Sequence, residues 1–233
     1  FSGDVVGGGE TSTLDELPDY LTSSFGFPYS YGATFAFELL DGLAGDFGAL
    51  DNALKDPPIS TEQVLHPEKY LAGEQPLELR LPPVNDLLGG GWTEVATSTF
   101  GEFEFNLWIN VLAGTDPLEL IDIGAEGWNG DAHGMYSGPD DSALMAGVIA
   151  WDDIVADHPE FEQAINASIE TSGFSTRTQL SDEYVFWQNE IGYLAFSAAS
   201  DPGFTVYVIG QDLDTVQATL ATLQASPSHY VLT

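Results

Sequence analysis

A β-hairpin is encoded in HGMYSGPDDSALMAGVIAW, residues 133–151. The segments near 133–136 and 143–151 are strand-like, and the second is apolar over most of its length. The polar turn at 138–141 holds a glycine, a proline and two aspartates, which favour a chain reversal. The stretch therefore predicts two neighbouring antiparallel strands.

Helices and strands alternate after the hairpin. Asp152 or Asp153 can cap a helix at its first turn. Phe161, Ile165 and Ile169 recur on one side of this helix, as they would if that side were buried. Three strands and a second helix complete the pattern, at 184–187, 193–197, 204–209 and after Asp212. The order predicts an antiparallel sheet with two packed helices.

Before the hairpin the apolar pattern is mainly helical. A helix that begins near Tyr29 and stops at the glycines of 42–45 is apolar on nearly all sides, which predicts that it is buried. Further helices are expected at 13–24, 47–54, 101–112 and 116–124, with a helical turn from Ser60 or Thr61 and one strand at 77–81.

The predicted fold class is α+β, with an N-terminal helical part followed by a mixed antiparallel β-sheet with two packed helices. Three parts are expected. They are an N-terminal arm and helix at 1–24, a mainly helical, peptidase-like part at 25–125, and an α+β part with the antiparallel sheet at 126–233.

The charge of the chain is almost entirely negative. It has 37 Asp and Glu against 4 Lys and Arg, a formal net charge of -33, yet 43% of its residues are hydrophobic. Such a surface repels itself in dilute buffer, whereas at molar salt the screening length falls to about 3 Å. The composition therefore indicates a halophilic protein with hydrated cations at its surface.

The same composition argues against several other classes. A disordered acidic tail would concentrate its charge and lack aromatic residues, but here the carboxylates are scattered and aromatic residues are frequent. Phosphate groups would be repelled, so neither nucleic acid nor anionic lipid is expected as a partner. No apolar run of about 18 residues exists, which predicts no direct membrane insertion.

The location is expected to be extracellular or at the cell surface. The absence of cysteine excludes disulfides and thiolate metal sites. The start at Phe1 is neither an initiator methionine nor a signal peptide, and it suggests a processed or excised piece. Asn166 begins a glycosylation sequon, which fits a secreted protein.

The first motif with candidate functional residues is PPISTEQVLHPEKY, at 57–70. Glu62 and His66 stand four residues apart, so on a helix they share one face and His66 could act as a base or a metal ligand. Glu68 adds a second carboxylate. The structural alternative is that a Ser or Thr caps a helical turn while His66 and Lys69 fix the segment that follows.

The second motif is GWNGD, at 127–131, with His133 close behind it. Glycines beside Trp128 and Asp131 suggest a tight turn that brings a carboxylate to a fixed place. That carboxylate could serve a functional site, or it could simply anchor the hairpin.

Established catalytic signatures are missing from the sequence. It has no His-Glu-x-x-His helix, no Gly-x-Ser-x-Gly elbow, no phosphate loop and no dinucleotide fingerprint. The acidic segment at 151–160 offers oxygens for calcium, but its spacing is not that of an EF-hand, and scattered carboxylates are normal for a halophile. We therefore predict no catalytic residue, no metal ligand and no cofactor in this chain.

Several segments together resemble one family, that of secreted or lipoprotein-type proteins of haloarchaea and some bacteria. The similarity covers roughly residues 25–210. It is carried by YSYGATF at 29–35, the proline-framed block at 57–70, FGE at 100–102, GWNGD at 127–131, WDD at 151–153 and EF at 160–161.

Members of that family look like relatives of zinc metallopeptidases, whose His-Glu-x-x-His helix lies before the matching region. The resemblance implies a peptidase-like scaffold without its metal-binding half, so zinc is expected only if an upstream segment is present. The matching positions, onto which no catalytic role transfers, are Glu62, His66, Pro67, Glu68, Trp128, Gly130 and Asp131. Relatives often have a basic residue where Ala132 and His133 stand here.

Three functions are consistent with the sequence. The first is a non-catalytic extracellular or cell-surface domain that acts through binding or assembly, with itself or another cell-surface protein as partner. The alternative is the substrate-side portion of a secreted zinc metallopeptidase, whose catalytic helix lies upstream or on another chain. The third is a small-ligand binding protein that uses Trp92, Trp108 and Trp128.

Overall fold

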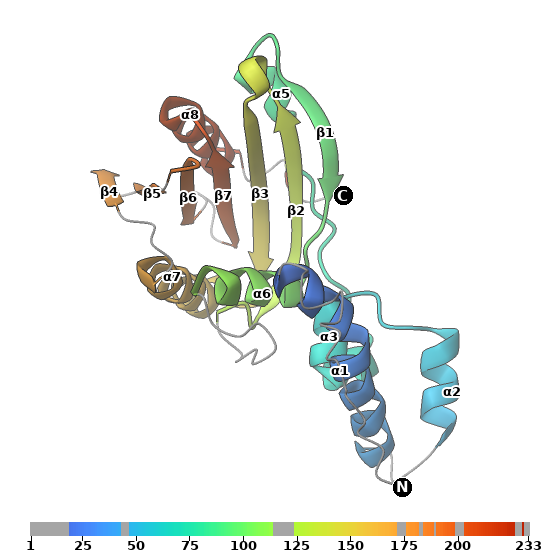
Figure 1. The fold of residues 1–233 in the computed structure, drawn as a ribbon. Helices are drawn as coiled ribbons and strands as arrows, with labels where there is room; N and C mark the ends of the chain where they lie inside the picture. Colours follow the sequence, from blue (N-terminus) through green and yellow to red (C-terminus); the bar gives the residue numbers. More distant parts are fainter. Residues whose placement is uncertain are drawn as a thin grey trace, which may run out of the picture.

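An antiparallel sheet forms the centre of the molecule (Figure 1). The computed structural model describes residues 19–42, 47–113, 124–171, 176–181, 184–188, 190–198, 203–226 and 230. Within these residues, seven strands lie side by side in the order β1-β2-β3-β7-β6-β5-β4. They are β1 (Thr93–Ser98), β2 (Trp128–Ser137), β3 (Ala143–Trp151), β4 (Thr176–Ser181), β5 (Tyr184–Gln188), β6 (Tyr193–Ala198) and β7 (Phe204–Gly210).

The hairpin of β2 and β3 stands inside the sheet. It pairs from Trp128 opposite Trp151 to Ser137 opposite Ala143. The other neighbour of β3 is β7, the last strand of the described residues. A helix therefore carries the chain from the end of β3 to the far edge, and the meander from β4 to β7 brings it back to the centre.

The apolar run of β3 is explained by burial on both faces. Side chains alternate along a strand. Leu144, Ala146 and Val148 belong to the core on one face, whereas Ile149 and Trp151 belong to the core on the other. A strand with two buried faces is continuously apolar instead of alternating between apolar and polar residues.

Helices pack on both faces of the sheet and beyond one of its ends. They are α1 (Asp19–Gly42), α2 (Phe47–Lys55), α3 (Thr61–Leu65), α4 (Pro67–Ala72), α5 (Val84–Leu88), α6 (Glu102–Ala113), α7 (Ile154–Thr171) and α8 (Leu213–Gln224). α8 packs on one face, with α5 beside it, while α6 and α7 pack together across one end of the other face (Figure 1). α1 to α4 form a helical layer that extends beyond that end, where α1 and α3 contact α6 (Figure 1).

Most sequence predictions for the described residues are confirmed. The fold class is α+β, with N-terminal helices before the antiparallel sheet. The hairpin, the helix after it, the three strands of the meander and the last helix all form. Asp153 caps α7 and Asp212 caps α8, because each carboxylate accepts a hydrogen bond from a backbone N–H in the first turn. No described helix is both long enough and apolar enough to cross a membrane.

Three local predictions are wrong in whole or in part. Residues 77–81 form no continuous strand: Leu79 alone makes an isolated β-bridge, while the Leu77 N–H donates to the Asn129 carbonyl and the Arg80 N–H to that of Tyr230. The GWNGD segment begins with a tight turn, since Gly127 has a φ of +82° and the Trp128 N–H donates to the Ala125 carbonyl, but from Trp128 on it belongs to strand β2. α1 runs through Pro28 without ending, although a helix start was expected after that proline.

Other elements were not anticipated. β1, β4, α4 and α5 carry little apolar periodicity of their own, and β1 is exposed along its whole length. β1 forms because it pairs with β2, so its strand character comes from a neighbour distant in sequence. The helix expected at 116–124 and the one expected at 13–24 fall wholly or mostly outside the described residues.

Candidate functional site

The motifs singled out in the sequence meet where the helical layer joins the sheet. Their charged side chains form a cluster that we call the polar seam. It consists of Glu62, His66, Lys69, Glu102, Asp131 and Asp152. These residues come from α3, the α3–α4 junction, α4, the first turn of α6, β2 and the end of β3. Segments 83 residues apart in sequence are therefore brought together.

The proline-framed block at 57–70 folds into two short helices, α3 and α4, which bring its charged side chains to the polar seam. Ser60 caps α3, since its Oγ accepts a hydrogen bond from the Gln63 N–H at 3.2 Å. Pro67 stands in the first turn of α4, where its missing N–H is not needed. His66 lies between the two helices. The Gln63 amide accepts from Ile59 N–H and donates to the Glu74 carbonyl, which closes the block at both ends.

Lys69 stands at the centre of one half of the polar seam. Its Nζ lies 2.6 Å from Glu62 Oε1, 2.6 Å from Asp152 Oδ2 and 3.1 Å from Glu74 Oε1. Burial raises the pKa of Glu62 to about 7, although the hydrogen bond from Lys69 opposes this. Burial lowers the pKa of Lys69, but its hydrogen bonds to Asp152 and Glu62 outweigh this and raise it overall. One ammonium thus holds three carboxylates together, and Glu62 can keep a proton near neutral pH.

The same carboxylates have the spacing of a metal site. Oxygens of Glu62, Glu74 and Asp152 lie within 4.8 Å of one another. The ammonium of Lys69 occupies the position that a cation would take. Zinc prefers nitrogen and sulfur ligands, whereas this set offers only oxygens. The residues therefore fit an internal ion pair better than they fit zinc.

His66 connects the two helices to α6. Its Nε2 lies 2.9 Å from Oε1 of Glu102, a side chain only 1% exposed. The hydrogen bond with Glu102 raises the pKa of His66, while burial opposes the shift. Glu68 is exposed and its Oε1 is 3.8 Å from His66 Nδ1, so it contributes only weakly.

Asp131 closes the N-terminus of α6. Its Oδ2 accepts from the Phe100 N–H at 2.9 Å, and its Oδ1 accepts from the Gly101 N–H at 2.8 Å and the Trp128 Nε1–H at 3.1 Å. A carboxylate at this end of a helix also interacts favourably with the helix dipole. Gly101 has a φ of +88°, and a Cβ there would lie 2.6 Å from Thr61 Oγ1. The sequence suggested that GWNGD serves a site or anchors the hairpin; in the structure Asp131, on strand β2, binds the segment that opens α6.

His133 is part of the same anchor and not a free imidazole. Its ring stacks on Phe100, with ring centroids 3.9 Å apart and an angle of 19° between the planes. Its Nδ1 lies 3.8 Å from Asp131 Oδ2, beyond a normal hydrogen bond. Trp128 is fully buried in the core under α6 and α7.

The acidic segment after β3 does not converge on one point. Asp152 binds Lys69, Asp153 caps α7, and Asp157 accepts from the Asp153 N–H at 2.8 Å. His158 Nδ1 lies 2.6 Å from Thr205 Oγ1, and burial lowers its pKa. The Asn166 amide donates to the Glu162 carbonyl of its own helix. These carboxylates therefore serve local structure instead of forming a shared calcium site.

Sequence reasoning did not find the partners of two residues at the centre of the seam. Lys69 and Glu102 lie in motifs that the sequence marks, but nothing in the sequence pairs either with its distant partner. One weak signal in the sequence pointed to Lys69. The chain has only 4 Lys and Arg, so a basic residue inside a motif is unusual. Glu104 was also missed, and burial raises its pKa to about 7.

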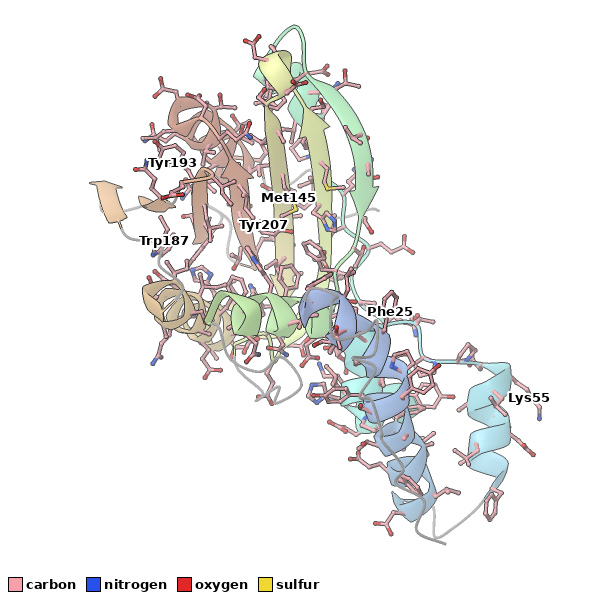
Figure 2. All side chains as sticks on the ribbon, in the orientation of Figure 1. Phe25, Lys55, Met145, Trp187, Tyr193 and Tyr207 are labelled. Atoms are coloured by element: carbon pink, nitrogen blue, oxygen red, sulfur yellow. The ribbon has the colours of Figure 1, made fainter. Side chains whose placement is uncertain are left out.

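An apolar groove lies on the sheet, apart from the polar seam. It has a volume of about 400 Å³ and is lined mainly by Trp108, Met135, Met145, Ile191, Leu194 and Ile209. Met145 and Tyr207 stand on neighbouring strands, on the face that α6 covers in part (Figure 2). Of the tryptophans considered for ligand binding, Trp108 lines this groove, whereas Trp92 and Trp128 each line another hollow, and Trp128 is only 1% exposed.

Comparison with known proteins finds no matching family model, no matching curated protein and no matching solved structure. The chemistry of the site must therefore be judged from its geometry. Four of its ionisable groups are under 20% exposed and bound to partners on other elements. Such an arrangement joins the helical layer to the sheet.

Proposed function

We propose that this chain is a non-catalytic extracellular or cell-surface domain of a halophilic protein, and that it acts through binding or assembly. The observation that supports this most is that the buried carboxylates of the polar seam are bound to other groups of the protein. Glu62, Glu102 and Asp131 are buried, and each carboxylate already has a charged or backbone partner within the protein.

General acid–base catalysis requires a group within hydrogen-bond reach of a substrate. His66 and Lys69, the seam's two basic groups, are directed into Glu102, Glu62 and Asp152. To act on a substrate, Lys69 would first have to break these bonds, and buried charges left unpaired are costly. His66 would have only its Nδ1 to offer, which lies 3.8 Å from Oε1 of the exposed Glu68. The hydrogen bond with Glu102 raises the pKa of His66, and burial raises that of Glu62, so neither shift needs a catalytic explanation.

The catalytic question can be tested with the purified chain in molar potassium chloride. We expect no hydrolysis of a mixed fluorogenic peptide library and no stoichiometric zinc by elemental analysis of the protein. His66→Gln should lower the stability of the fold without changing this background. Peptide hydrolysis that disappears in a folded His66→Gln variant would contradict the non-catalytic role.

The halophilic part of the proposal rests on the charge of -33. Repulsion between carboxylates should destabilise the fold in dilute buffer and weaken as salt screens them. We expect the urea midpoint to rise strongly between dilute buffer and molar potassium chloride. Equal midpoints in the two solutions would contradict salt adaptation.

A second candidate is the substrate-side portion of a secreted zinc metallopeptidase whose catalytic helix lies upstream or on another chain. It is favoured by the convergence of four resembling segments, since the blocks at 57–70, 100–102, 127–131 and 151–153 meet in the polar seam. Sequencing the encoding reading frame tests it. A His-Glu-x-x-His segment upstream, together with zinc-dependent hydrolysis by the longer chain, would favour this candidate over the first.

A further inference from the structure

The sheet face that carries the apolar groove is packed against helices at one end. α6 and α7 lie across that end, and α8 packs on the opposite face (Figure 1). Trp108 of α6 forms the boundary, since it lines the groove and its ring centroid lies 5.8 Å from that of Tyr207 on β7. Met135, on the far side of the groove, is 46% exposed. The groove therefore has a helical wall at one end and is open to solvent.

The floor of the groove is one row of apolar side chains across four strands. The strands pair so that four side chains stand opposite one another on this face, and all four line the groove: Met135, Met145, Ile209 and Leu194. Two of them are methionines, whose flexible and polarisable side chains adapt to irregular shapes. The volume of about 400 Å³ is in the range of small-molecule sites.

The lining of the groove carries no charge. None of the described residues that line it is Asp, Glu, Lys, Arg or His, although the chain has 37 Asp and Glu in 233 residues. The amide oxygen of Gln211, a polar member of the lining, already accepts from the Ala143 N–H at 3.2 Å. A cation would find no opposite charge here, and an anion would meet a chain with a charge of -33. The lining therefore favours a neutral molecule.

A buried hydroxyl without a partner lies beside this floor. Tyr207 belongs to the next row toward α6, two residues along β7 from Ile209. It is fully buried, and its Oη has no hydrogen-bond partner among the described residues. Burial raises the pKa of Tyr207, and Asp131 adds to the shift, so the hydroxyl keeps its proton and remains a donor. Unsatisfied buried polar groups are uncommon, because each costs free energy, and they often mark a missing partner.

The Tyr207 hydroxyl is directed along the row toward β2. Gly147 of β3 pairs with Tyr207 on one side and with His133 of β2 on the other. A Cβ at Gly147 would clash with Cζ and Oη of Tyr207, so the ring lies over this glycine. Met145 and Met135 are the next side chains on this face along β3 and β2 (Figure 2 labels Met145 and Tyr207). The hydroxyl therefore lies next to the two methionines of the groove floor.

We propose that the groove binds a small, neutral, largely apolar molecule whose hydrogen-bond acceptor, such as a carbonyl oxygen, accepts from the Tyr207 hydroxyl. The apolar part lies on the floor beside Trp108, and the acceptor passes between Met135 and Met145 to reach Tyr207. This deepens the proposed binding role and rests on it.

Larger occupants fit the groove less well. An extended peptide would bring backbone N–H and C=O groups, which need partners that apolar side chains do not supply. A second copy of the chain would bring another charge of -33 to the same face. A neutral small molecule meets neither difficulty.

Prodan, a neutral naphthalene dye with one ketone, is a suitable probe, because its emission shifts to the blue in an apolar site. We expect saturable binding with this shift when prodan is added to the folded chain in molar potassium chloride. Tyr207→Phe should weaken the binding about fivefold, since it removes one hydrogen bond to a neutral acceptor. The same variant should bind the ketone-free naphthylamine as tightly as the wild type does.

The stability of Tyr207→Phe separates a ligand role of the hydroxyl from a structural one. Because the hydroxyl has no partner among the described residues, its removal should leave the urea midpoint unchanged or raise it. A clear fall in the midpoint would mean that the hydroxyl supports the fold, and it would contradict the assignment to a ligand.

Matched variants locate the binding. Ala143 lines the groove at an exposed position, so Ala143→Trp should fill the groove and weaken prodan binding at least tenfold while the fold is kept. Ala96→Trp, at an exposed position on β1 outside the groove, should leave the binding unchanged. A sulfonated analogue of the dye should bind at least tenfold more weakly than prodan, because the lining offers no opposite charge. Circular dichroism of each variant checks the fold.

Other outcomes would overturn the proposal. Binding that does not saturate, or that Ala143→Trp leaves unchanged, means that the dye does not use the groove. A wild-type dimer that Ala143→Trp dissociates, with no prodan binding, means that a second copy covers the groove instead. None of these results touches the non-catalytic role, which depends on peptide hydrolysis and zinc content. Conversely, peptide hydrolysis by a chain that binds prodan as expected would contradict that role and leave this site intact.

Discussion

The centre of the sheet and the polar seam are held together by different forces. In the sheet, apolar side chains of β3 and β7 pack between helices on both faces, and the contribution of each depends on the area it buries. In the seam, a few ion pairs and hydrogen bonds join distant segments in a partly buried place. The stability that the sheet contributes should therefore be nearly independent of pH, whereas the stability that the seam contributes should change with pH.

The largest effect is expected for a charge placed in the sheet. Val148 on β3 is fully buried in the core beneath α8. Val148→Asp would bury an unpaired carboxylate, which costs several kcal/mol, so we expect a loss of about 5 kcal/mol or failure to fold. Urea unfolding in molar potassium chloride measures it.

The matched control is Val95→Asp, on the exposed strand β1, where Val95 is 64% exposed. It should change the free energy of unfolding by no more than about 0.5 kcal/mol. Similar losses for the two variants would mean that the sheet centre is not the dominant core.

A smaller but still large effect is expected when the seam loses its ammonium. Lys69→Met leaves Glu62 and Asp152 without their shared partner, and breaking a buried pair costs about 3 kcal/mol. Urea unfolding at neutral pH measures the loss. Adding Glu62→Gln to Lys69→Met should restore part of it, because one unpaired charge is then removed.

Lys55→Met is the control for that change, because Lys55 lies exposed on α2. It removes the same charge from the chain but should cost less than about 1 kcal/mol. If Lys55→Met is as harmful as Lys69→Met, overall charge and not the seam explains the effect.

The smallest expected effect is the pH dependence of the free energy of unfolding, which should come from the seam and not from the sheet. Burial raises the pKa of Glu62 from 4.5 to about 7, so its proton stabilises the fold below the unfolded value and this contribution is lost as pH rises through about 7. The Glu102 hydrogen bond raises the pKa of His66, so its contribution is present below 6.5 and is lost as pH rises through the folded value. Both predict falling stability between mild acid and mild alkali.

We expect the free energy of unfolding to fall by about 1 kcal/mol between about pH 6 and pH 8 for the Glu62 contribution alone. Glu62→Gln should flatten this part of the profile, while the matched change Glu78→Gln, at an exposed position, should leave the slope as it is. A wild-type profile that rises across the window would show that neither group behaves as its surroundings predict.

The sheet was largely predictable from the sequence. Runs of β-branched and aromatic residues, separated by turn residues, predict the hairpin of β2 and β3 and the meander that ends in β7. These signals are local in the sequence. β1 was not predictable, because its pairing with β2 and not its own pattern makes it a strand.

The candidate site was predictable only in part. The sequence marked Glu62, His66, Trp128, Asp131 and His133, and the structure places them at one junction. Their partners could not be inferred, since the Lys69–Asp152 pair spans 83 residues and nothing local encodes it. The expected burial of α1 was wrong for Phe25, Tyr29 and Phe37, which are exposed, because an apolar pattern does not show which other segment will cover each residue.

The amino-acid sequence by itself determined the α+β class, the order of most elements and the strongly acidic character of the chain, because periodicity and charge are local or summed properties. Tertiary structure alone decided that β3 pairs with β7, that Lys69 gathers three carboxylates, and that one side of α1 is left uncovered. The physical reason is that each of these depends on which distant segments become neighbours, and that choice is made by the packing of the whole chain.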